Sequence, residues 1–495
     1  MANAAIPLCV DCDGTLVRTD LLHEAVFMML KSAPWKLLLL PLWWLRGKAY
    51  LKERIAESVS FDWSTIPLND DIVTLVRAAN DEGRKVILAT ASHQRLADGL
   101  ATHLQLFTEV VATRDGVDMT GRKKAAWLVS QYGERGFDYA GNARADLPVW
   151  SVSRSATVVS SSPSLIEAAR KIAQVDRVIP IVKPRLSAYV RAMRLHQWLK
   201  NLLLLVPLLA AHRLGRGDDL ANAGLGFLAF GLCASTVYVF NDLLDLPADR
   251  LHARKRTRPF ASALVPVWHG AVMIPLLLMA SFYLASRLPI AFSAVLATYF
   301  ALTLSYSILL KRQVVVDVIM LAGLYTIRVI AGGAATGIVP SFWLLAFSMF
   351  MFLSLALVKR YSELRESSQK QKSSAFGRGY WTHDLPVLLS AGTSSGMVAV
   401  LVIALYINSP ETRSLYANPA WLWFVPPLLL YWVTRVWMKA HRGEIDDDPV
   451  VFAARDWQSL LILVLCALLF SLAHSPEFGG ALRALFGAPG VHPSS

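Results

Sequence analysis

Apolar and polar positions divide the chain into two parts with different patterns. Up to about residue 180, short apolar runs, such as those at 7–10 and 85–90, alternate with mixed stretches of helical periodicity. This alternation is typical of an α/β domain built on a parallel sheet. The prolines of the stretch 179–184 end this pattern. Beyond it, apolar segments follow one another to about residue 475, and most of them suit a bilayer span, which needs about 20 residues.

These patterns predict the domain organisation. We expect an α/β domain over 1–180 and an all-α bundle of nine membrane spans over 199–475. A linker with a basic, amphipathic interfacial helix occupies 181–198, and a tail without a readable pattern follows at 476–495. The nine apolar segments lie near 199–212, 220–240, 266–286, 288–310, 314–336, 339–358, 386–408, 420–438 and 457–473.

The basic residues predict how the bundle is oriented. The loops at 241–263, 311–313, 359–385 and 439–456 carry sixteen Lys and Arg, whereas the opposite loops and the tail carry five. Loops rich in Lys and Arg stay on the cytoplasmic side of a membrane. We therefore predict a multi-pass protein of the cell (inner) membrane, with these loops and the N-terminal domain in the cytoplasm.

Composition narrows the class further. A chain of 495 residues that is 55% hydrophobic is too long and too apolar for one soluble domain. The net charge of +13 comes from basic residues between apolar segments, which argues for membrane topology and against nucleic acid as a partner. Four Cys do not make a disulfide framework, and Cys9 and Cys12 lack the second pair of a zinc site. No cleavable signal peptide is visible at the start.

An acidic stretch at the end of the second apolar segment carries the strongest chemical signal. Asp242, Asp245 and Asp249 are spaced i, i+3, i+7, which places them on one face of a helix. Carboxylates crowded at a membrane boundary need cations, and oxygen-rich clusters suit Mg²⁺ that shares its remaining positions with phosphates. The basic run at 252–258 supplies donors for phosphate oxygens. The stretch therefore predicts a diphosphate site at the membrane surface.

The same residues carry a family resemblance. The stretch from Asn241 to Arg250 resembles the NDxxDxxxDR motif of the UbiA superfamily of intramembrane prenyltransferases. Its continuation through His252, Lys255 and Arg258 resembles DRxHxxKxxRP of the decaprenyl-phosphate phosphoribosyltransferase branch. The resemblance, which covers roughly 185–475, implies Mg²⁺ on the three aspartates and substrate contacts from the other residues named here.

Further motifs of the bundle extend this resemblance. Tyr306, Lys311 and Asp317 fit the pattern YSxxLKxxxxxD, which implies phosphate contacts and a second metal or substrate contact at Asp317. Asp317 and Arg328 are eleven residues apart and share a helical face, so a structural ion pair is the alternative. The remaining candidates for substrate binding, whose alternative role is anchoring at the bilayer edge, are Lys200 and Asn201 of HQWxKN and the pair Lys359 and Arg360.

Four pieces of the N-terminal domain resemble haloacid dehalogenase (HAD) phosphatases with a helical cap, here at about 20–75. They are Asp11-x-Asp13-Gly-Thr at the end of one strand, Thr90 and Ser92 at the end of another, Gly121-x-x-Lys124-x-x-x-Leu128, and Gly141-Asn142-x-x-x-Asp146. Ligands of open α/β sheets bind at the carboxyl ends of strands, where these pieces lie. The resemblance covers about 5–170.

The resemblance implies a role for each of these residues. Asp11 would be the nucleophile and Asp13 the general acid and base. Thr90, or Ser92, would bind a phosphoryl oxygen, and Lys124 would neutralise charge. Mg²⁺ would be held by Asp11, the carbonyl of Asp13, and Asp146. Asn142 stands where the family usually has an acid, so a degenerate domain that only binds phosphate is the alternative.

Residues 32–46 hold an apolar run rich in Trp and Leu, too short to span a bilayer. We expect cap helices here. Their apolar side chains pack in the cap core or, alternatively, dip into the membrane interface between Lys36 and Arg46.

Together, the resemblances imply a membrane transferase that joins a polyprenyl phosphate to a soluble diphosphate, phosphoribosyl diphosphate, with Mg²⁺-assisted loss of diphosphate. The fused HAD domain would then remove the 5-phosphate of the product lipid. One alternative is an aromatic polyprenyltransferase acting on a 4-hydroxybenzoate-like ring, in which the diphosphate belongs to the lipid. A second is a membrane-anchored HAD lipid phosphatase, which leaves Asp242, Asp245 and Asp249 without a role.

Overall fold

The computed structural model describes residues 6–369, 379–445 and 449–475, so the tail at 476–495 lies outside the described residues. The described residues form two compact units. The first comprises the chain up to Arg194 together with Ser235–Leu277, and the second comprises Leu195–Ala234 together with the chain from Leu278 onward. The acidic stretch, expected within the membrane bundle, therefore packs with the N-terminal residues.

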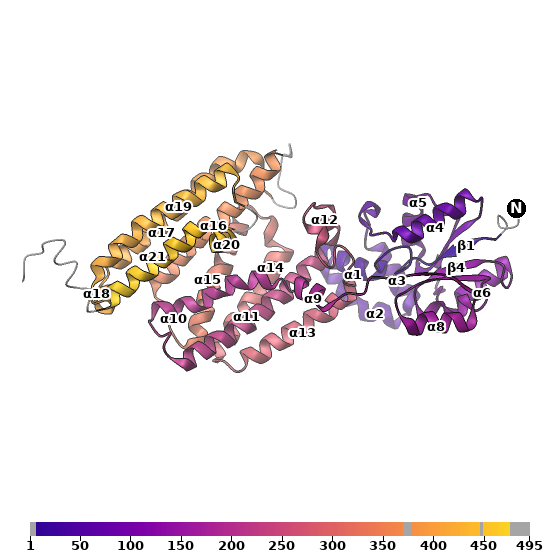
Figure 1. Cartoon of the computed structure of the whole chain (residues 1–495), viewed down its shortest axis with the longest axis horizontal. Coiled ribbons are helices and arrows are strands. Elements are labelled where there is room, and N and C mark those ends of the chain that lie inside the picture. Colours follow the sequence, from indigo (N-terminus) through magenta and orange to yellow (C-terminus); the bar gives the residue numbers. More distant parts are fainter. Residues whose placement is uncertain (1–5, 370–378, 446–448, 476–495) are drawn as a thin grey trace, which may run out of the picture. The chain divides into compact units, whose positions relative to one another are not determined.

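Six parallel strands form the sheet in the described part of the first unit, in the order β3-β2-β1-β4-β5-β6 (Figure 1). The predicted α/β fold is confirmed. The strands are β1 (Leu8–Val10), β2 (Val86–His93), β3 (Glu109–Thr113), β4 (Asp138–Gly141), β5 (Ser155–Val159) and β6 (Val175–Ile179).

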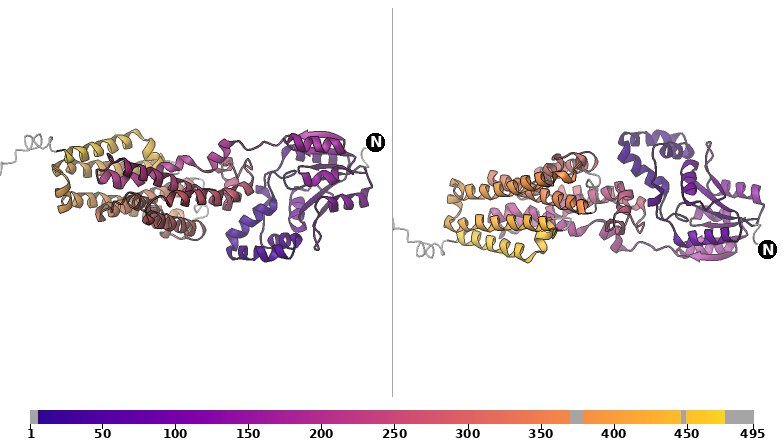
Figure 2. Two further views of the ribbon diagram at one scale, coloured as in Figure 1. Left: turned by 90° about the horizontal axis from the view of Figure 1, so that it is seen from below. Right: turned by 90° about the horizontal axis from the view of Figure 1, so that it is seen from above.

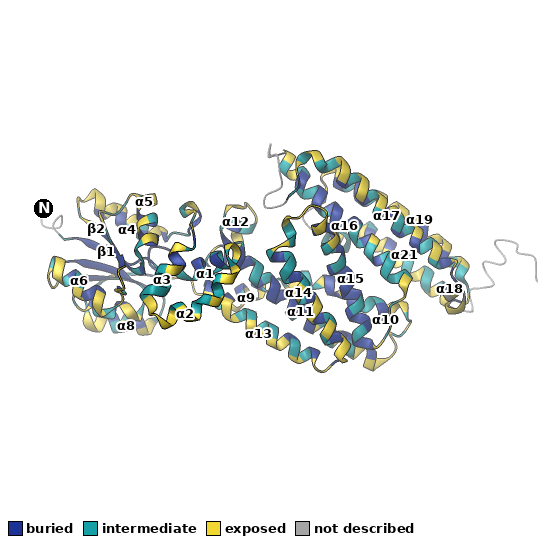
Figure 3. Ribbon diagram, turned by 180° about the vertical axis from the view of Figure 1, so that it is seen from behind, coloured by how far each residue is buried: buried dark blue, intermediate teal, exposed yellow. Residues whose placement is uncertain are grey.

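Both faces of this sheet are covered by helices. Leu8 and Val10 of β1 belong to one apolar cluster and Cys9 to another, because successive side chains of a strand point to opposite faces. One face packs against α4 (Asp70–Asp81) and α5 (Gln94–Leu104), the other against α6 (Arg122–Tyr132), α7 (Leu147–Trp150) and α8 (Pro163–Ile172). Figure 3 shows the strands as a buried layer with exposed residues on the helices outside. Burial on both faces explains why the strands read as short apolar runs.

Helices occupy the chain between β1 and β2, where the sequence predicts the cap. They are α1 (Leu21–Ser32), the 3₁₀ turn η1 (Pro34–Leu39), α2 (Leu40–Leu45) and α3 (Lys48–Glu57). After β6, α9 (Leu186–Ala192) packs with the ends of the helices that carry the acidic stretch, through Ala188, Ala192 and Val239.

Among the described residues, seven helices are long and apolar enough to cross a membrane. They are α11 (Gly217–Leu244), α13 (Val267–Ala285), α14 (Ile290–Ile308), α15 (Val316–Thr336), α16 (Phe342–Gln369), α17 (Leu385–Ile407) and α21 (Trp457–His474). The helices α16, α17, α19 (Val425–Arg442) and α21 run alongside one another (Figure 2). The expected helical membrane bundle is confirmed.

The count of nine spans is not confirmed. The first expected span is a short apolar stretch, Leu195–Ala210, made of the 3₁₀ segment η4 (Leu195–Leu205) and α10 (Val206–Ala210). The eighth is α19, whose last turns carry Arg435, Lys439 and Arg442. These charges keep α19 below the apolar content that a span requires.

Candidate active sites

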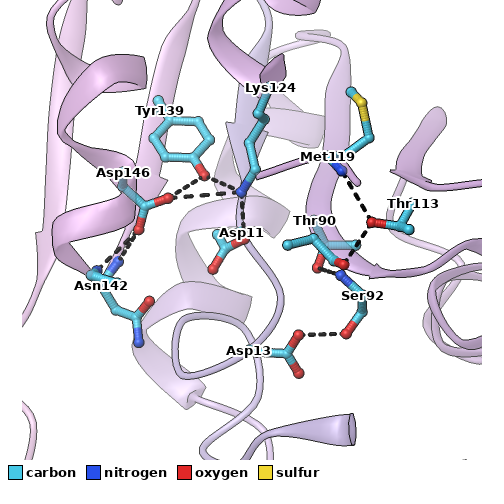
Figure 4. A network of polar contacts seen from close by, with 12 residues as sticks. Asp11, Asp13, Thr90, Ser92, Thr113, Met119, Lys124, Tyr139, Asn142 and Asp146 are labelled. Atoms are coloured by element: carbon cyan, nitrogen blue, oxygen red, sulfur yellow. Dashed lines mark hydrogen bonds and ion pairs between the residues drawn. The ribbon is translucent and has the colours of Figure 1, made fainter. Parts of the chain in front are cut away.

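The first candidate site lies at the carboxyl ends of β1 and β4, where the strand order reverses direction. Asp11 follows β1, and Lys124 projects from the first turn of α6. Lys124 Nζ donates to Asp11 Oδ1 at 2.7 Å and to the Tyr139 hydroxyl at 2.8 Å (Figure 4). Asp11 and Lys124 are both buried, so the ion pair is shielded from solvent. The structure thus brings together the predicted nucleophile and its cation.

Asp146, in the 3₁₀ turn η3 (Arg144–Asp146) that follows β4, completes this cluster. Its Oδ1 accepts from the Tyr139 hydroxyl at 2.8 Å, and its Oδ2 accepts from the backbone N–H groups of Asn142 and Ala143 at 3.0 Å each. Lys124 Nζ lies 3.7 Å from Asp146 Oδ1. Tyr139 therefore joins Lys124 to Asp146, and sequence reasoning missed it. A signal was present, since Tyr139 is a lone hydroxyl in a short buried strand.

Asp13 is oriented by two donors. The backbone N–H of Leu21 donates to Oδ1 at 2.8 Å, and the Ser92 hydroxyl donates to Oδ2 at 2.5 Å. Thr90 Oγ1 in turn accepts from the backbone N–H of Ser92 at 3.0 Å. Because the Ser92 hydroxyl serves Asp13, Thr90 is the better of the two predicted candidates for a phosphoryl oxygen.

The two aspartates differ in their surroundings. Burial raises the pKa of Asp11 to about 6, with the charge of Lys124 opposing the shift and that of Asp146 adding to it. Burial, together with the charge of Asp20, raises the pKa of Asp13 to about 7. At neutral pH Asp11 is then mostly ionised, while Asp13 carries a proton for much of the time. These states suit a nucleophile and a general acid, respectively.

Asn142 lies against the turn that follows Asp11. A Cβ on Gly14 would come within 2.0 Å of Asn142 Nδ2, and Gly14 has a φ of +73°. A glycine is therefore required at this position both for space and for backbone conformation. The backbone N–H of Asn142 donates to Asp146 Oδ2.

The oxygen donors of this site fit Mg²⁺. Across the residues described, no three His, Cys, Asp or Glu side chains gather as a metal site by themselves. Asp11 and Asp146 nonetheless share Lys124 as a partner, which places their carboxylates close together. Two carboxylates with a backbone carbonyl and phosphate oxygens are a set that Mg²⁺ accepts. In such a site Asp11, Asp146 and the Asp13 carbonyl would hold the ion.

The second candidate site is the acidic stretch, which spans two helices. The long helix α11 ends at Leu244, Asp245 precedes α12 (Leu246–Leu251), and Pro247 stands in the first turn of α12. Proline cannot continue a helix but is tolerated at its start. The spacing of the three aspartates predicts that they share one helical face. The structure differs, because the aspartates do not lie on one continuous helix.

Two arginines bind the outer two aspartates. Arg258 Nη1 lies 3.2 Å from Asp242 Oδ1 and 2.6 Å from Asp249 Oδ2, and Arg194 also pairs with Asp242 Oδ1. Asp242 and Asp249 are buried, whereas Asp245 turns to another partner. The structure thus brings together Asp242, Asp249 and Arg258. Arg194, in the basic stretch expected along the membrane surface, is a partner that sequence reasoning missed.

Unsatisfied oxygens at this site fit a bound cation. Asp242 Oδ2 and Asn241 Oδ1 are buried and accept no hydrogen bond from any described residue. A buried carboxylate oxygen without a donor is costly unless a cation or another donor reaches it. Mg²⁺ would be held by Asp242 and Asp249, with Arg258 released to a phosphate group.

Helix α1 binds the middle of the stretch. Lys31 Nζ donates to Asp245 Oδ1 at 2.7 Å and to the Leu244 carbonyl at 3.3 Å. Arg250 makes a bidentate pair with Glu24, at 2.9 and 2.6 Å, and Glu24 also accepts from the Thr19 hydroxyl at 2.5 Å. Arg250, predicted to bind substrate, is therefore engaged by the cap. Neither Glu24 nor Lys31 carries a signal in the sequence.

The basic residues that follow the acidic stretch are more exposed to solvent. His252 is exposed, and its Nδ1 accepts from the backbone N–H of Arg254 at 3.2 Å. Lys255 is half-buried in the short turn η5 (Lys255–Thr257). These two side chains lie next to the cluster of Asp249 and Arg258 along the chain, where a phosphate group can reach them.

In the second unit, Asp317 and Arg328 have separate partners. Asp317 Oδ2 lies 2.6 Å from Arg360 Nη2, and its Oδ1 accepts from the Tyr380 hydroxyl at 2.6 Å. Asp317 and Arg360 are fully buried, and Arg360 also pairs with Glu363. This favours a structural ion pair for Asp317, but with Arg360 as the partner, not Arg328.

Arg328 joins the predicted pair at the start of the bundle. Its Nε donates to Asn201 Oδ1 at 3.2 Å, and its Nη2 donates to the Tyr299 hydroxyl at 3.0 Å. Lys200 Nζ lies 5.6 Å from the centre of the Tyr325 ring, and Arg328 lies at the same distance from that ring. Asn201 Nδ2 is buried and makes no hydrogen bond to the residues described. Lys200, Asn201 and Arg328 thus form one buried cluster, which we call the arginine cluster.

The remaining predicted contacts are Tyr306, Lys311 and Lys359. Tyr306 is in the last turn of α14, and Lys311 is in the turn η6 (Leu310–Arg312) that follows. Lys359 is half-buried beside Arg360 in α16.

An α/β unit with an aspartate–lysine site, combined with apolar helices that bury acidic and basic groups, defines a membrane-embedded enzyme of two parts. Residues 203–460 match the UbiA prenyltransferase family. The chain belongs to this family, as its acidic motif predicts.

Curated relatives extend the match. An uncharacterized protein, y4nM, of Sinorhizobium fredii (strain NBRC 101917 / NGR234) is 36% identical over 474 residues, which cover 94% of this chain and 91% of the relative. The nodulation protein NoeC of Azorhizobium caulinodans is 36% identical over 289 residues, covering 57% of this chain and 91% of that protein. The decaprenyl-phosphate phosphoribosyltransferase of Mycolicibacterium smegmatis is 37% identical over 215 residues, covering 40% of this chain and 67% of that enzyme.

Solved structures are more distant. A UbiA homolog from Archaeoglobus fulgidus bound to DMAPP and Mg²⁺ has a TM-score of 0.45 at 16% identity, covering 60% of this chain and 99% of that one. A probable phosphoserine phosphatase from Vibrio cholerae has a TM-score of 0.25 at 15% identity, covering 36% and 61%.

Proposed function

We propose that this protein transfers the 5-phosphoribosyl group of phosphoribosyl diphosphate to a polyprenyl phosphate. The observation that carries the proposal is the cluster of Asp242 and Asp249 around Arg258, with a buried Asp242 oxygen left to be satisfied. The likeness to decaprenyl-phosphate phosphoribosyltransferase supports this substrate pair. Aromatic prenylation needs fewer cations than the run from Arg250 to Arg258 provides.

The residues of the cluster then have distinct roles. Mg²⁺ on Asp242 and Asp249 would supply charge neutralisation for the leaving diphosphate, while Asp245 keeps its pair with Lys31. Arg258, released from the aspartates, binds diphosphate oxygens through its planar fork of donors. The bond between ribose C1 and the diphosphate oxygen breaks, and an oxygen of the polyprenyl phosphate bonds to C1. This oxygen is already anionic, so no protein base is needed. His252 and Lys255 bind the ribose 5-phosphate.

The arginine cluster suits the second anion. Arg328 and Lys200 are buried cations whose surroundings include rings and amide and hydroxyl groups, and Asn201 adds an amide donor. Charged groups at membrane depth are expensive and usually serve a ligand. We assign this cluster to the phosphate of the polyprenyl phosphate, and Tyr306, Lys311, Lys359 and Arg360 to supporting roles.

The α/β unit acts on the product. Asp11 attacks the phosphorus of the 5-phosphate, and Asp13 donates a proton to the departing ribose oxygen. Asp13 then takes a proton from the water that hydrolyses the aspartyl-phosphate, and inorganic phosphate leaves. Lys124 and Thr90 neutralise and orient the phosphoryl oxygens. Removing the 5-phosphate draws a reversible transfer forward. Both sites are proposed to face the cytoplasm at the inner membrane.

One experiment separates the candidate activities. Membranes containing the protein are incubated with Mg²⁺ and either labelled phosphoribosyl diphosphate with polyprenyl phosphate, or 4-hydroxybenzoate with labelled polyprenyl diphosphate. We expect labelled lipid from the first pair. Product from the second pair alone would replace the proposal with aromatic prenylation. Phosphate release from a phosphorylated lipid, without product from either pair, would leave the lipid phosphatase.

A further inference from the structure

The segment that follows helix α1 has apolar side chains on two sides. In η1 and α2, Leu37, Leu40 and Trp43 pack against the core of the first unit. Five other apolar residues of the segment point outward and are between 58% and 80% exposed. We call this outward face the cap surface, and it consists of Trp35, Leu38, Leu42, Trp44 and Leu45.

A surface of this kind requires a covering partner. Soluble proteins rarely expose large contiguous apolar patches, and those that occur mark sites of protein or membrane contact. Here the inner side of the same segment already supplies the packing that the fold needs. The outward residues are therefore not part of the cap core.

The charges beside the cap surface match an anionic bilayer. Lys36, Arg46 and Lys48 lie in or next to the segment, and the sequence has no acidic residue between Glu24 and Glu53. Trp residues with flanking Lys and Arg are the composition of membrane interfaces. A protein partner with an apolar face would not require such one-sided charge.

Helix α1 contacts the end of α11, which is long and apolar enough to cross a membrane. Lys31, in the last turn of α1, donates to the carbonyl of Leu244, the last residue of α11, and to Asp245. Two residues separate Lys31 from Pro34, where η1 begins. The cap surface therefore begins a few residues along the chain from a side chain that contacts the end of α11.

We propose that Trp35, Leu38, Leu42, Trp44 and Leu45 insert into the interfacial layer of the membrane beside the end of α11, with Lys36, Arg46 and Lys48 binding anionic lipid headgroups. The cap of the α/β unit is then a membrane-docking element. If the proposed phosphatase function holds, docking keeps Asp11 close to a phosphate carried by a lipid.

The test uses the full-length protein in nanodiscs of phosphatidylcholine and phosphatidylglycerol. A Cys466→Ser background removes the one Cys of the four that is not buried. Leu38→Cys carries an environment-sensitive fluorophore, and Ile172→Cys in α8, also an exposed apolar position, is the matched control. Lipids spin-labelled near the headgroup should quench the probe at residue 38 about fivefold more strongly than at residue 172.

Equal quenching at the two positions would overturn the proposal. Disulfide-linked dimers through Leu38→Cys, without lipid quenching, would identify a second copy as the occupant and overturn it as well. Replacing Lys36, Arg46 and Lys48 by Gln should weaken the quenching, and its persistence unchanged would exclude the anionic lipid contact.

A second measurement distinguishes an effect on docking from an effect on catalysis. Leu38→Glu with Leu42→Glu should slow dephosphorylation of a lipid-borne phosphate about tenfold and leave a soluble phosphate ester unaffected. Equal slowing of both would contradict docking. If the parent protein hydrolyses neither ester, the phosphatase proposal fails, while the quenching result stands independently.

Discussion

Individual carboxylates in this protein are distinguished by the groups that neutralise them. Asp11 has Lys124, Asp242 has two arginines, and Asp317 has Arg360. A buried carboxylate is tolerated because a cation is held against it, and removing either partner leaves an uncompensated charge. The three carboxylates differ in whether both of their oxygens have a partner. Asp242 keeps a buried oxygen without a donor from the described residues, which marks it for a ligand.

Replacing Asp242 by Asn should abolish most transfer activity. The amide keeps the shape of the side chain but loses the charge that holds Mg²⁺ and Arg258, so we expect transfer about 10²–10³-fold slower. The measurement is labelled-lipid formation in membranes with equal amounts of protein. Asp218→Asn, an exposed change at the opposite end of α11, is the control and should leave the rate unchanged. Full activity in Asp242→Asn would contradict the metal assignment.

Tyr139 offers a second test at this scale. Tyr139→Phe removes the hydroxyl that accepts from Lys124 and donates to Asp146, while the ring stays in place. Groups that orient metal ligands usually affect metal affinity by about 10–100-fold. We expect the Mg²⁺ concentration needed for half-maximal phosphate release to rise by at least about tenfold. A lower maximal rate with unchanged Mg²⁺ dependence would instead indicate a role on Lys124 alone. Exposed Tyr431→Phe in α19 is a control.

At the scale of elements, the break between α11 and α12 is the decisive feature. Because Pro247 begins a new helix, Asp245 turns to Lys31, and Arg250 reaches Glu24. The cap helix α1 thus binds the motif at two points. One of them, the pair of Glu24 and Arg250, is almost completely buried.

Breaking this pair should destabilise the first unit. Glu24→Ala leaves the guanidinium of Arg250 buried without its partner, at a cost of about 3–5 kcal/mol. We expect faster hydrogen exchange in 246–262 in Glu24→Ala, and partial recovery when Arg250→Met is added. Arg54→Ala, which removes an exposed pair with Glu57, should change exchange there very little. Unchanged exchange in Glu24→Ala would show that the cap does not hold the motif.

The buried pair that joins α15 and α16 can be tested by the same logic. Arg360→Met should lower bundle stability by about 3–5 kcal/mol, since Asp317 would be left buried without its cation. Adding Asp317→Asn should restore most of that loss. If Asp317 is structural, the double variant also keeps most of its transfer activity, measured at equal protein. If it holds a metal, stability returns without activity. Ser394→Ala at an exposed position of α17 is a control.

At the scale of the whole molecule, the proposed function places two chemistries at two positions of one ribose. The proposed transfer would create a lipid that still carries a 5-phosphate, which the α/β unit would remove. Because both units belong to one chain, they are made in equal amounts. The proposed intermediate would also be generated on the chain that carries the α/β unit, which would raise its effective concentration.

Blocking the α/β site should therefore expose the intermediate. Asp11→Asn keeps the hydrogen bonding of Lys124 but removes the nucleophile, so labelled 5-phosphorylated lipid should accumulate where the parent releases the dephosphorylated lipid. Thin-layer separation of the two lipids measures the ratio. Asp115→Asn, a change at an exposed loop position, should behave as the parent. If the parent itself releases only the phosphorylated lipid, the coupling is wrong.

Local sequence determined much of this protein. Apolar runs near the length of a bilayer predicted most spans, and short apolar strands followed by Asp11, Thr90 and Asn142 predicted the parallel sheet and its site. These features depend on neighbours along the chain, through helical or strand periodicity and the carboxyl ends of strands. The family motifs likewise named Asp242, Asp249 and Arg258 before their contacts were seen.

Only the tertiary structure decided which side chains contact the site residues. Arg194, Glu24 and Lys31 carry no signal of their own, because charged side chains are common at such positions. Their contacts join residues up to 226 positions apart, and local pattern does not encode such distances. The restart of the helix at Pro247 and the pairing of Asp317 with Arg360 are of the same kind. Which groups meet is set by packing, since a buried charge must find an opposite charge somewhere in the folded chain.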